Sequence, residues 1–91
     1  MYEITFSKRA ERSLKRLHRS GSFSREAFDS LLTLLAASDP LPPRYKDHQL
    51  KGKLAEYREC HLVFDLLVVY ERDDTQKVVT IVATGTHDDL F

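Results

Sequence analysis

The sequence predicts a single α+β domain spanning residues 1–91, in which an antiparallel sheet carries a two-helix N-terminal hairpin on one face. In the first half, apolar residues recur at helical spacing. The second half holds short runs of strand-forming residues separated by brief turns. Short connections favour antiparallel neighbours, so the expected element order is β-α-α-β-β-β. A chain of 91 residues is long enough for one hydrophobic core.

The first half begins with a strand and continues into two helices. Residues 2–6 alternate and are rich in strand formers. Ser7 is expected to cap a basic helix over residues 8–18, whose narrow apolar stripe suits packing on a sheet. Gly21 breaks this helix, and either Ser22 or Ser24 is expected to cap the next.

The second helix has a broader, leucine-rich face and ends in the proline-rich run 39–43, which starts at Asp39. Three strands are expected after it, over residues 54–62, 66–71 and 77–83, with a turn at 72–75. The strand pattern stops at Ala83, and a Thr-Gly-Thr turn then presents His87 close to the last residue. Leu90 and Phe91 are expected to pack back and hold that histidine in place.

Composition excludes several classes of protein. Apolar residues make up 42% of the chain and charged residues 31%, as in a folded protein rather than a disordered one. No apolar run approaches the roughly 20 residues that cross a bilayer, and the first residues do not resemble a signal peptide. Cys60 is the single cysteine and has no disulfide partner. We therefore expect a cytoplasmic protein with no membrane partner.

Charge is unevenly distributed although the formal net charge is zero. Basic residues crowd the first helix and recur in the middle of the chain, whereas acidic residues gather near the end. Basic faces attract phosphate backbones, and the alternative is an ordinary solvated helix surface. The candidate RNA-binding residues are Lys8, Arg12, Lys15, Arg16, Lys46, Lys51, Lys53 and Arg58.

Three histidines and one aspartate could supply acid–base chemistry: His48, His61, Asp65 and His87. RNA cleavage without a metal needs a base for the ribose 2′-hydroxyl, an acid for the departing 5′-oxygen, and positive groups near the phosphate. Each residue also has a purely structural interpretation, as an exposed or half-buried histidine or a turn former. A metal site is a further alternative, but the spacing matches no recognised ligand pattern, so no metal or cofactor is predicted.

Four segments together resemble the YafQ-type toxins of the RelE/ParE superfamily, over nearly the whole chain. They are Tyr45-Lys46-Asp47-His48-Gln49-Leu50-Lys51-Gly52, Tyr57-Arg58-Glu59-Cys60-His61, Asp65 with Leu67-Val68-Val69-Tyr70, and Thr84-Gly85-Thr86-His87-Asp88-Asp89-Leu90-Phe91. Their joint occurrence in this order is far more specific than any one of them. The resemblance implies a RelE-like fold and a bacterial ribonuclease that enters the A site of the 70S ribosome and cuts mRNA.

The resemblance also implies partners and site residues. A DinJ-like antitoxin would neutralise the toxin, and operator DNA would be contacted only through that antitoxin. Carried over by motif, the catalytic positions are His48, His61, Asp65, His87 and Phe91. His87 would be the general acid, His61 or His48 the base or charge stabiliser, and Asp65 would orient an imidazole.

Two positions depart from the family pattern. Ala83 stands where the family usually has an arginine that would grip the scissile phosphate, and Leu66 stands where close relatives carry an aromatic residue. Ala83 is either the native residue of a weakened or divergent toxin or a disarming substitution. Two other functions therefore stay open: a ParE-like toxin that binds gyrase without nuclease activity, and a degenerate, non-toxic module that binds the antitoxin.

Overall fold

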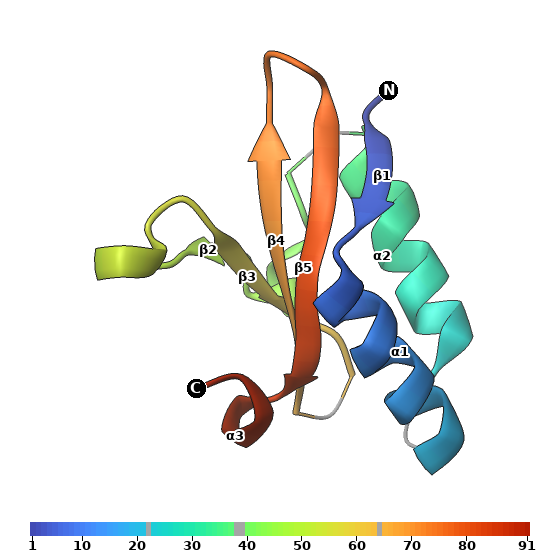
Figure 1. Ribbon diagram of the computed structural model, residues 1–91. Helices are drawn as coiled ribbons and strands as arrows, with labels where there is room; N and C mark the ends of the chain where they lie inside the picture. The colour runs from blue at the N-terminus through green and yellow to red at the C-terminus, as the bar shows by residue number, and fades with distance from the viewer. Residues whose placement is uncertain (22, 38–39, 64) are drawn as a thin grey trace.

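The computed structural model describes residues 1–21, 23–37, 40–63 and 65–91, and these form two layers (Figure 1). A twisted sheet forms one layer, and two helices packed against one side of it form the other. The elements in chain order are β1 (Glu3–Phe6), α1 (Lys8–Ser20), α2 (Arg25–Ala37), the 3₁₀ turn η1 (Pro43–Tyr45), β2 (His48–Gln49), the 3₁₀ turn η2 (Gly52–Leu54), β3 (Arg58–His61), β4 (Leu66–Asp73), β5 (Val78–Thr86) and α3 (His87–Leu90). The predicted α+β class is confirmed.

Within the described chain, the sheet has five strands in the order β1-β5-β4-β3-β2. Strands β3, β4 and β5 pair antiparallel in succession, as predicted. Strand β2, which was not predicted, pairs antiparallel with β3, and β1 pairs with β5 in parallel. Connection length predicts the pairing of consecutive strands only. Since β1 and β5 are separated by almost the whole chain, the sequence held no signal for their relative direction.

The expected bounds of the later strands were partly wrong. Strand β3 begins at Arg58 rather than at residue 54, because Gly52 adopts a φ of +66° and opens the 3₁₀ turn η2. The expected turn at 72–75 begins later, since Arg72 and Asp73 still pair with β5. Strand β5 continues to Thr86, through the Thr-Gly-Thr segment expected to be a turn.

The helix caps follow the sequence closely. The Ser7 hydroxyl oxygen accepts a hydrogen bond from the Ala10 N–H at 3.0 Å, and Gly21 ends α1 in the left-handed region at φ +75°. Ser24 caps α2 by accepting from the Ala27 N–H at 3.2 Å. The expectations for Ser22 and Asp39 lie outside the described residues.

The hydrophobic core lies between the two layers. Leu31 of α2, Val68 of β4 and Ile81 of β5 are fully buried there. Helices α1 and α2 both lie on the side of the sheet that faces the core, whereas η2 and α3 lie toward the other side (Figure 1). We call the side without α1 and α2 the open face. No described helix is both long and apolar enough to cross a membrane.

Candidate active site on the open face

Two of the predicted histidines meet on the open face around a glutamate. His48 of β2 lies opposite Glu59 of β3, and His61 lies two residues further along β3, so strand alternation places all three on one face. Glu59 Oε1 lies 3.5 Å from His48 Nε2 and 3.9 Å from His61 Nε2. The Glu59 side chain is only 8% exposed, against 50% for His48 and 33% for His61. The imidazoles are therefore open to solvent, while the carboxylate beneath them is not.

The His48 ring is oriented by the backbone. Its Nδ1 lies 2.8 Å from the Lys46 carbonyl oxygen, which can only accept, so Nδ1 carries the proton. In the neutral ring, Nε2 is then the unprotonated nitrogen, and it faces Glu59. A proton taken up at Nε2 would be shared with a carboxylate already in position. This arrangement suits a general base.

Asp65 does not join this group. The residue is exposed in the turn immediately before β4, and no hydrogen bond or ion pair joins its carboxylate to another described side chain. Glu59 is the carboxylate that faces the imidazoles, and sequence reasoning missed it. The available signal was the spacing of Glu59 and His61, which puts both on one face of a strand. The orienting role expected of Asp65 stays a prediction.

His87 is held by the short helix α3, which was not predicted, at the same end of the sheet as His61, because His61 pairs with Leu67 and Leu67 pairs with Gly85. The Thr86 hydroxyl accepts from the Asp89 N–H at 3.2 Å, and Asp89 Oδ2 accepts from the Thr86 N–H at 2.9 Å. These reciprocal bonds form a capping box. The Thr86 N–H also holds the pKa of Asp89 below its usual value, helped by the Thr86 hydroxyl. His87 is the first residue of this helix.

Phe91, the last residue, packs against the His87 ring but is not buried. The centroids of the Phe91 and His87 rings lie 5.2 Å apart, and Phe91 as a whole residue is 53% exposed. Gly85 permits this packing, since a Cβ there would lie 2.9 Å from the Asp89 Cβ. The expected association of Phe91 with His87 is present, and the catalytic role expected of Phe91 stays a prediction.

A hollow of about 230 Å³ adjoins α3 on this face. Ala83, 3% exposed, contributes to its wall together with Phe91 at the end of the chain and Tyr57 before β3. The complete lining is Arg9, Leu50, Leu54, Tyr57, Val69, Val82, Ala83, Leu90 and Phe91. The position at which the family usually has arginine therefore borders an open space beside Phe91, whose ring contacts His87.

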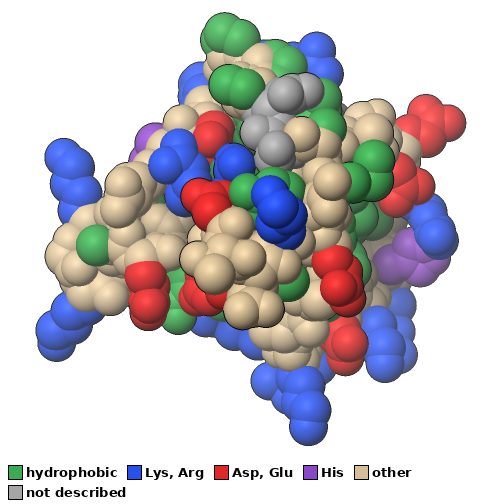
Figure 2. Space-filling model, turned by 90° about the horizontal axis from the view of Figure 1, so that it is seen from above, with side chains coloured by type: hydrophobic (Ala, Val, Ile, Leu, Met, Phe, Trp, Pro, Cys, Tyr) green, Lys and Arg blue, Asp and Glu red, His purple; other side chains and the backbone are tan. Residues whose placement is uncertain are grey.

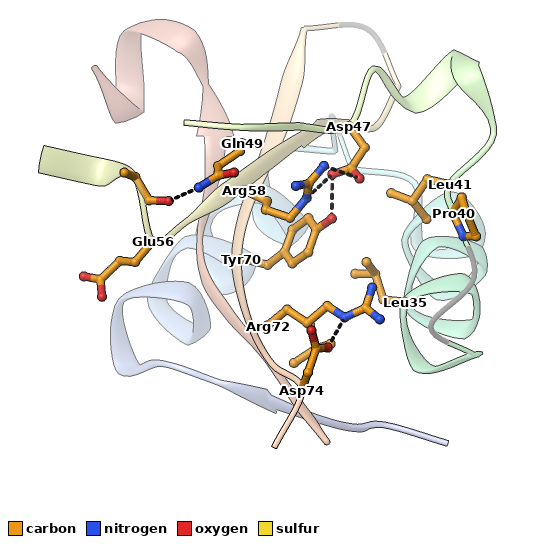
Figure 3. Close-up of a pocket in the computed structure, with 12 residues that line it drawn as sticks. Leu35, Pro40, Leu41, Asp47, Gln49, Glu56, Arg58, Tyr70, Arg72 and Asp74 are labelled. Carbon is orange, nitrogen blue, oxygen red and sulfur yellow. Dashed lines mark hydrogen bonds and ion pairs between the residues drawn. The ribbon is translucent and has the colours of Figure 1, made fainter. Parts of the chain in front are cut away.

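One predicted phosphate-binding residue points to the opposite side of the sheet. Arg58 donates to Asp47 from Nε at 3.3 Å and from Nη2 at 3.0 Å, and the Tyr70 hydroxyl donates to the same carboxylate (Figure 3). These groups line a cavity of about 680 Å³. Burial and the bond to Asp47 raise the pKa of Tyr70, and the bonds to Asp47 raise that of Arg58. The Arg58 guanidinium is thus committed to a structural network.

The remaining predicted cations are exposed and spread widely. Three of them, Lys46, Lys51 and Lys53, lie near β2 and η2. The others lie along α1 and are Lys8, Arg12, Lys15 and Arg16. Seen from above, Lys and Arg side chains project around the outline of the molecule rather than forming one patch (Figure 2). Among the described residues, no three His, Cys, Asp or Glu side chains are arranged to hold a metal ion.

Known proteins share this architecture and part of this sequence. The E. coli K12 mRNA interferase toxin YafQ is 42% identical over 62 residues, which are 67% of this chain and 65% of that protein. The aligned stretch thus spans slightly less than two thirds of that relative's length. A metal-bound toxin from Helicobacter pylori has a TM-score of 0.92 at 41% identity, with both chains fully covered. The E. coli DinJ–YafQ complex has a TM-score of 0.87 at 30% identity, covering 100% of this chain and 99% of that one.

The match extends along nearly the whole sequence. The family model described as the bacterial toxin of type II toxin–antitoxin systems, YafQ, covers residues 2–91. This range includes both histidines of the Glu59 group, the hollow and the C-terminal helix. The chain therefore belongs to the YafQ family of bacterial toxins from type II toxin–antitoxin systems.

Proposed function

We propose that this protein is a ribosome-dependent mRNA endonuclease that inhibits translation and is neutralised by a cognate antitoxin. The observation that carries the proposal is the open face itself, where His48 and His61 surround a buried carboxylate and His87 is held beside Phe91. The E. coli relative is named an mRNA interferase toxin, which supports the same chemistry here.

The proposed reaction is transesterification within the RNA. A base, His48 or His61, removes the proton from a ribose 2′-hydroxyl, and the resulting oxygen attacks the adjacent phosphorus. The bond from phosphorus to the 5′-oxygen breaks, and His87 protonates that leaving oxygen. A 2′,3′-cyclic phosphate and a free 5′-hydroxyl result. Glu59 would stabilise the imidazolium that forms when the base takes up its proton.

We propose that this reaction is metal-independent, because two imidazoles and the general acid supply every proton transfer it needs. The H. pylori relative is described as metal-bound, so the point needs its own measurement. Protein that has been stripped of bound metal by a chelator, and then freed of the chelator, should still cleave mRNA on ribosomes supplied with Mg²⁺. Activity that is lost on this treatment and returns only when another divalent metal is added back to the protein would contradict metal independence.

The proposed partners follow from the relatives and from charge. A DinJ-like antitoxin is supported by the E. coli DinJ–YafQ complex, and operator DNA would be reached only through that antitoxin. The exposed cations Lys8, Arg12, Lys15 and Arg16 of α1, with those around η2, would dock the protein on ribosomal RNA, chiefly through its phosphates. Because this chemistry takes place on translating ribosomes, we propose that the protein acts in the cytoplasm.

The test is induction of two forms in bacteria, this sequence and Ala83→Arg, with mapping of mRNA ends during growth arrest. Cleavage is expected within codons on the ribosome, and more strongly for Ala83→Arg. If Ala83→Arg produced no cleavage at ribosome-bound codons, the proposal would fail. A gyrase supercoiling assay on the same proteins serves as the control. The ParE-like and non-toxic alternatives are not favoured, since neither explains three histidines on one face.

A further inference from the structure

Arg9 lies beside the hollow although it belongs to a different element from the histidines. It is the second residue of α1 and lines the hollow together with Ala83 and Phe91. The start of α1 is fastened to β5 at this point. The Ser7 hydroxyl donates to the Val82 carbonyl at 2.6 Å, and the Ser7 N–H donates to the Ile81 carbonyl at 2.9 Å. The Arg9 backbone therefore has a fixed position relative to Ala83.

The Arg9 guanidinium is available for a ligand. Its side chain is exposed, and none of the ion pairs in the described part of the chain includes it. Arg58 differs in this respect, because Asp47 occupies its guanidinium. Among the described residues that line the hollow, Arg9 is the only one with a positive charge.

The rest of α1 extends this positive charge toward α3. Arg16 is seven residues after Arg9 and lies on the same side of the helix. Its charge contributes to the lowered pKa of Asp89, after the larger effect of the Thr86 N–H and hydroxyl. One side of α1 thus places a cation at the hollow and another near the His87 helix. An RNA backbone crossing the open face would pass both.

We propose that Arg9 is the phosphate-binding cation of this active site, where it occupies the space left open at Ala83. This inference rests on the proposed function. When the 2′-oxygen attacks, negative charge grows on the non-bridging phosphoryl oxygens, and a guanidinium can donate two parallel N–H bonds to them. The aliphatic and aromatic walls of the hollow limit solvent screening, which strengthens such bonds.

The first test measures binding of a short RNA whose 2′-hydroxyls are methylated, so that the attacking oxygen is blocked. Arg9→Ala is expected to weaken binding by about tenfold or more and to reduce the salt dependence by about one phosphate contact. Arg9→Lys should restore part of the affinity. The matched control is Arg19→Ala, which removes the same charge from the same helix but outside the hollow. It should change affinity by less than about twofold.

The second test is a double-mutant cycle with Ala83→Arg. An arginine at position 83 would reach the same hollow, so Arg9→Ala should cost much less binding in that background. Purely additive losses would overturn the assignment of one shared phosphate. Equal affinities for Arg9→Ala and Arg19→Ala would overturn the inference, as would absence of binding by the unaltered protein. Binding that depends on Arg9, without cleavage on ribosomes, would instead support the Arg9 site and refute the proposed nuclease.

Discussion

Two carboxylates on opposite faces of the sheet, Asp47 just before β2 and Glu59 in β3, have different hydrogen-bond partners. Asp47 precedes β2 on the helix-covered side of the sheet and accepts hydrogen bonds from both Arg58 and Tyr70. Glu59 of β3 lies on the open face, and no hydrogen bond joins its carboxylate to another described side chain. Its neighbours are two imidazole nitrogens at 3.5 and 3.9 Å.

We propose that the Asp47 group is a structural network and that the Glu59 group is a reactive one. The Asp47 network satisfies its donors internally and leaves little capacity for a ligand. The Glu59 group keeps imidazole nitrogens and nearby cations open to solvent, as proton transfer to RNA requires. Changes on the open face should therefore affect cleavage, and changes around Asp47 should affect stability.

The largest expected effect is on the open face. In an Ala83→Arg background, His87→Ala should lower cleavage by about 10²–10⁴-fold, because the leaving oxygen loses its acid. The His87 side chain is exposed, so the free energy of unfolding should change by less than about 0.5 kcal/mol. Single-turnover cleavage and urea denaturation measure the two quantities. Unchanged cleavage would remove His87 from the mechanism.

The next largest effect is expected on stability, from a change on the helix-covered side of the sheet. Asp47→Ala should lower the free energy of unfolding by about 2–3 kcal/mol, because it leaves the Arg58 guanidinium and the Tyr70 hydroxyl without their acceptor. The estimate lies below that for a fully buried pair, since the Arg58 side chain is 36% exposed. Chemical denaturation checks it. A loss as small as that of an ordinary surface substitution would show that the network contributes little.

A smaller change isolates one bond of that network. Tyr70→Phe removes the hydroxyl that donates to Asp47 and leaves the ring in the core, so we expect a loss of about 1 kcal/mol. Cleavage should stay within about twofold of the parent, since no reacting group is touched. A large loss of cleavage with normal stability would show that the Asp47 network affects the reaction on the open face.

The smallest effect is the response of α3 to acid. The Thr86 N–H bond lowers the pKa of Asp89 below 3.8, so the bond's contribution is present above that value and is lost as the pH falls through the lowered pKa. Because Asp89 is exposed, only α3 should loosen. The Thr86 amide resonance should follow this titration in NMR and should be unaffected by Asp88→Asn. A midpoint at or above 3.8 would contradict the capping box.

Sequence reasoning was most successful where the signal was local. The Ser7 cap and the glycine that ends α1 follow from short-range rules, and the structure shows both. The spacing Thr86 to Asp89 also matches a capping box, so α3 could have been predicted. Strand β2 has two residues, too few to show any periodicity.

The candidate site was harder to predict because it depends on strand register. Pairing His48 with Glu59 makes that carboxylate part of the site, and the same register brings Arg58 to Asp47. A shift of one residue would have exchanged these two faces. Sequence alone therefore suggested the histidines but did not reveal that Arg58 binds Asp47 or that Glu59 faces the imidazoles.

The most direct test compares Asp47→Asn with Glu59→Gln, two equivalent carboxyl-to-amide changes on opposite faces, both in the Ala83→Arg background. Unfolding free energy and single-turnover cleavage are measured on the same preparations. Glu59→Gln should lower cleavage by about tenfold or more with nearly unchanged stability, because the imidazolium loses its counter-charge. Asp47→Asn should lower stability while folded protein still cleaves. The reverse pattern, with Glu59→Gln destabilising but fully active, would contradict the assignment of the open face as the active site.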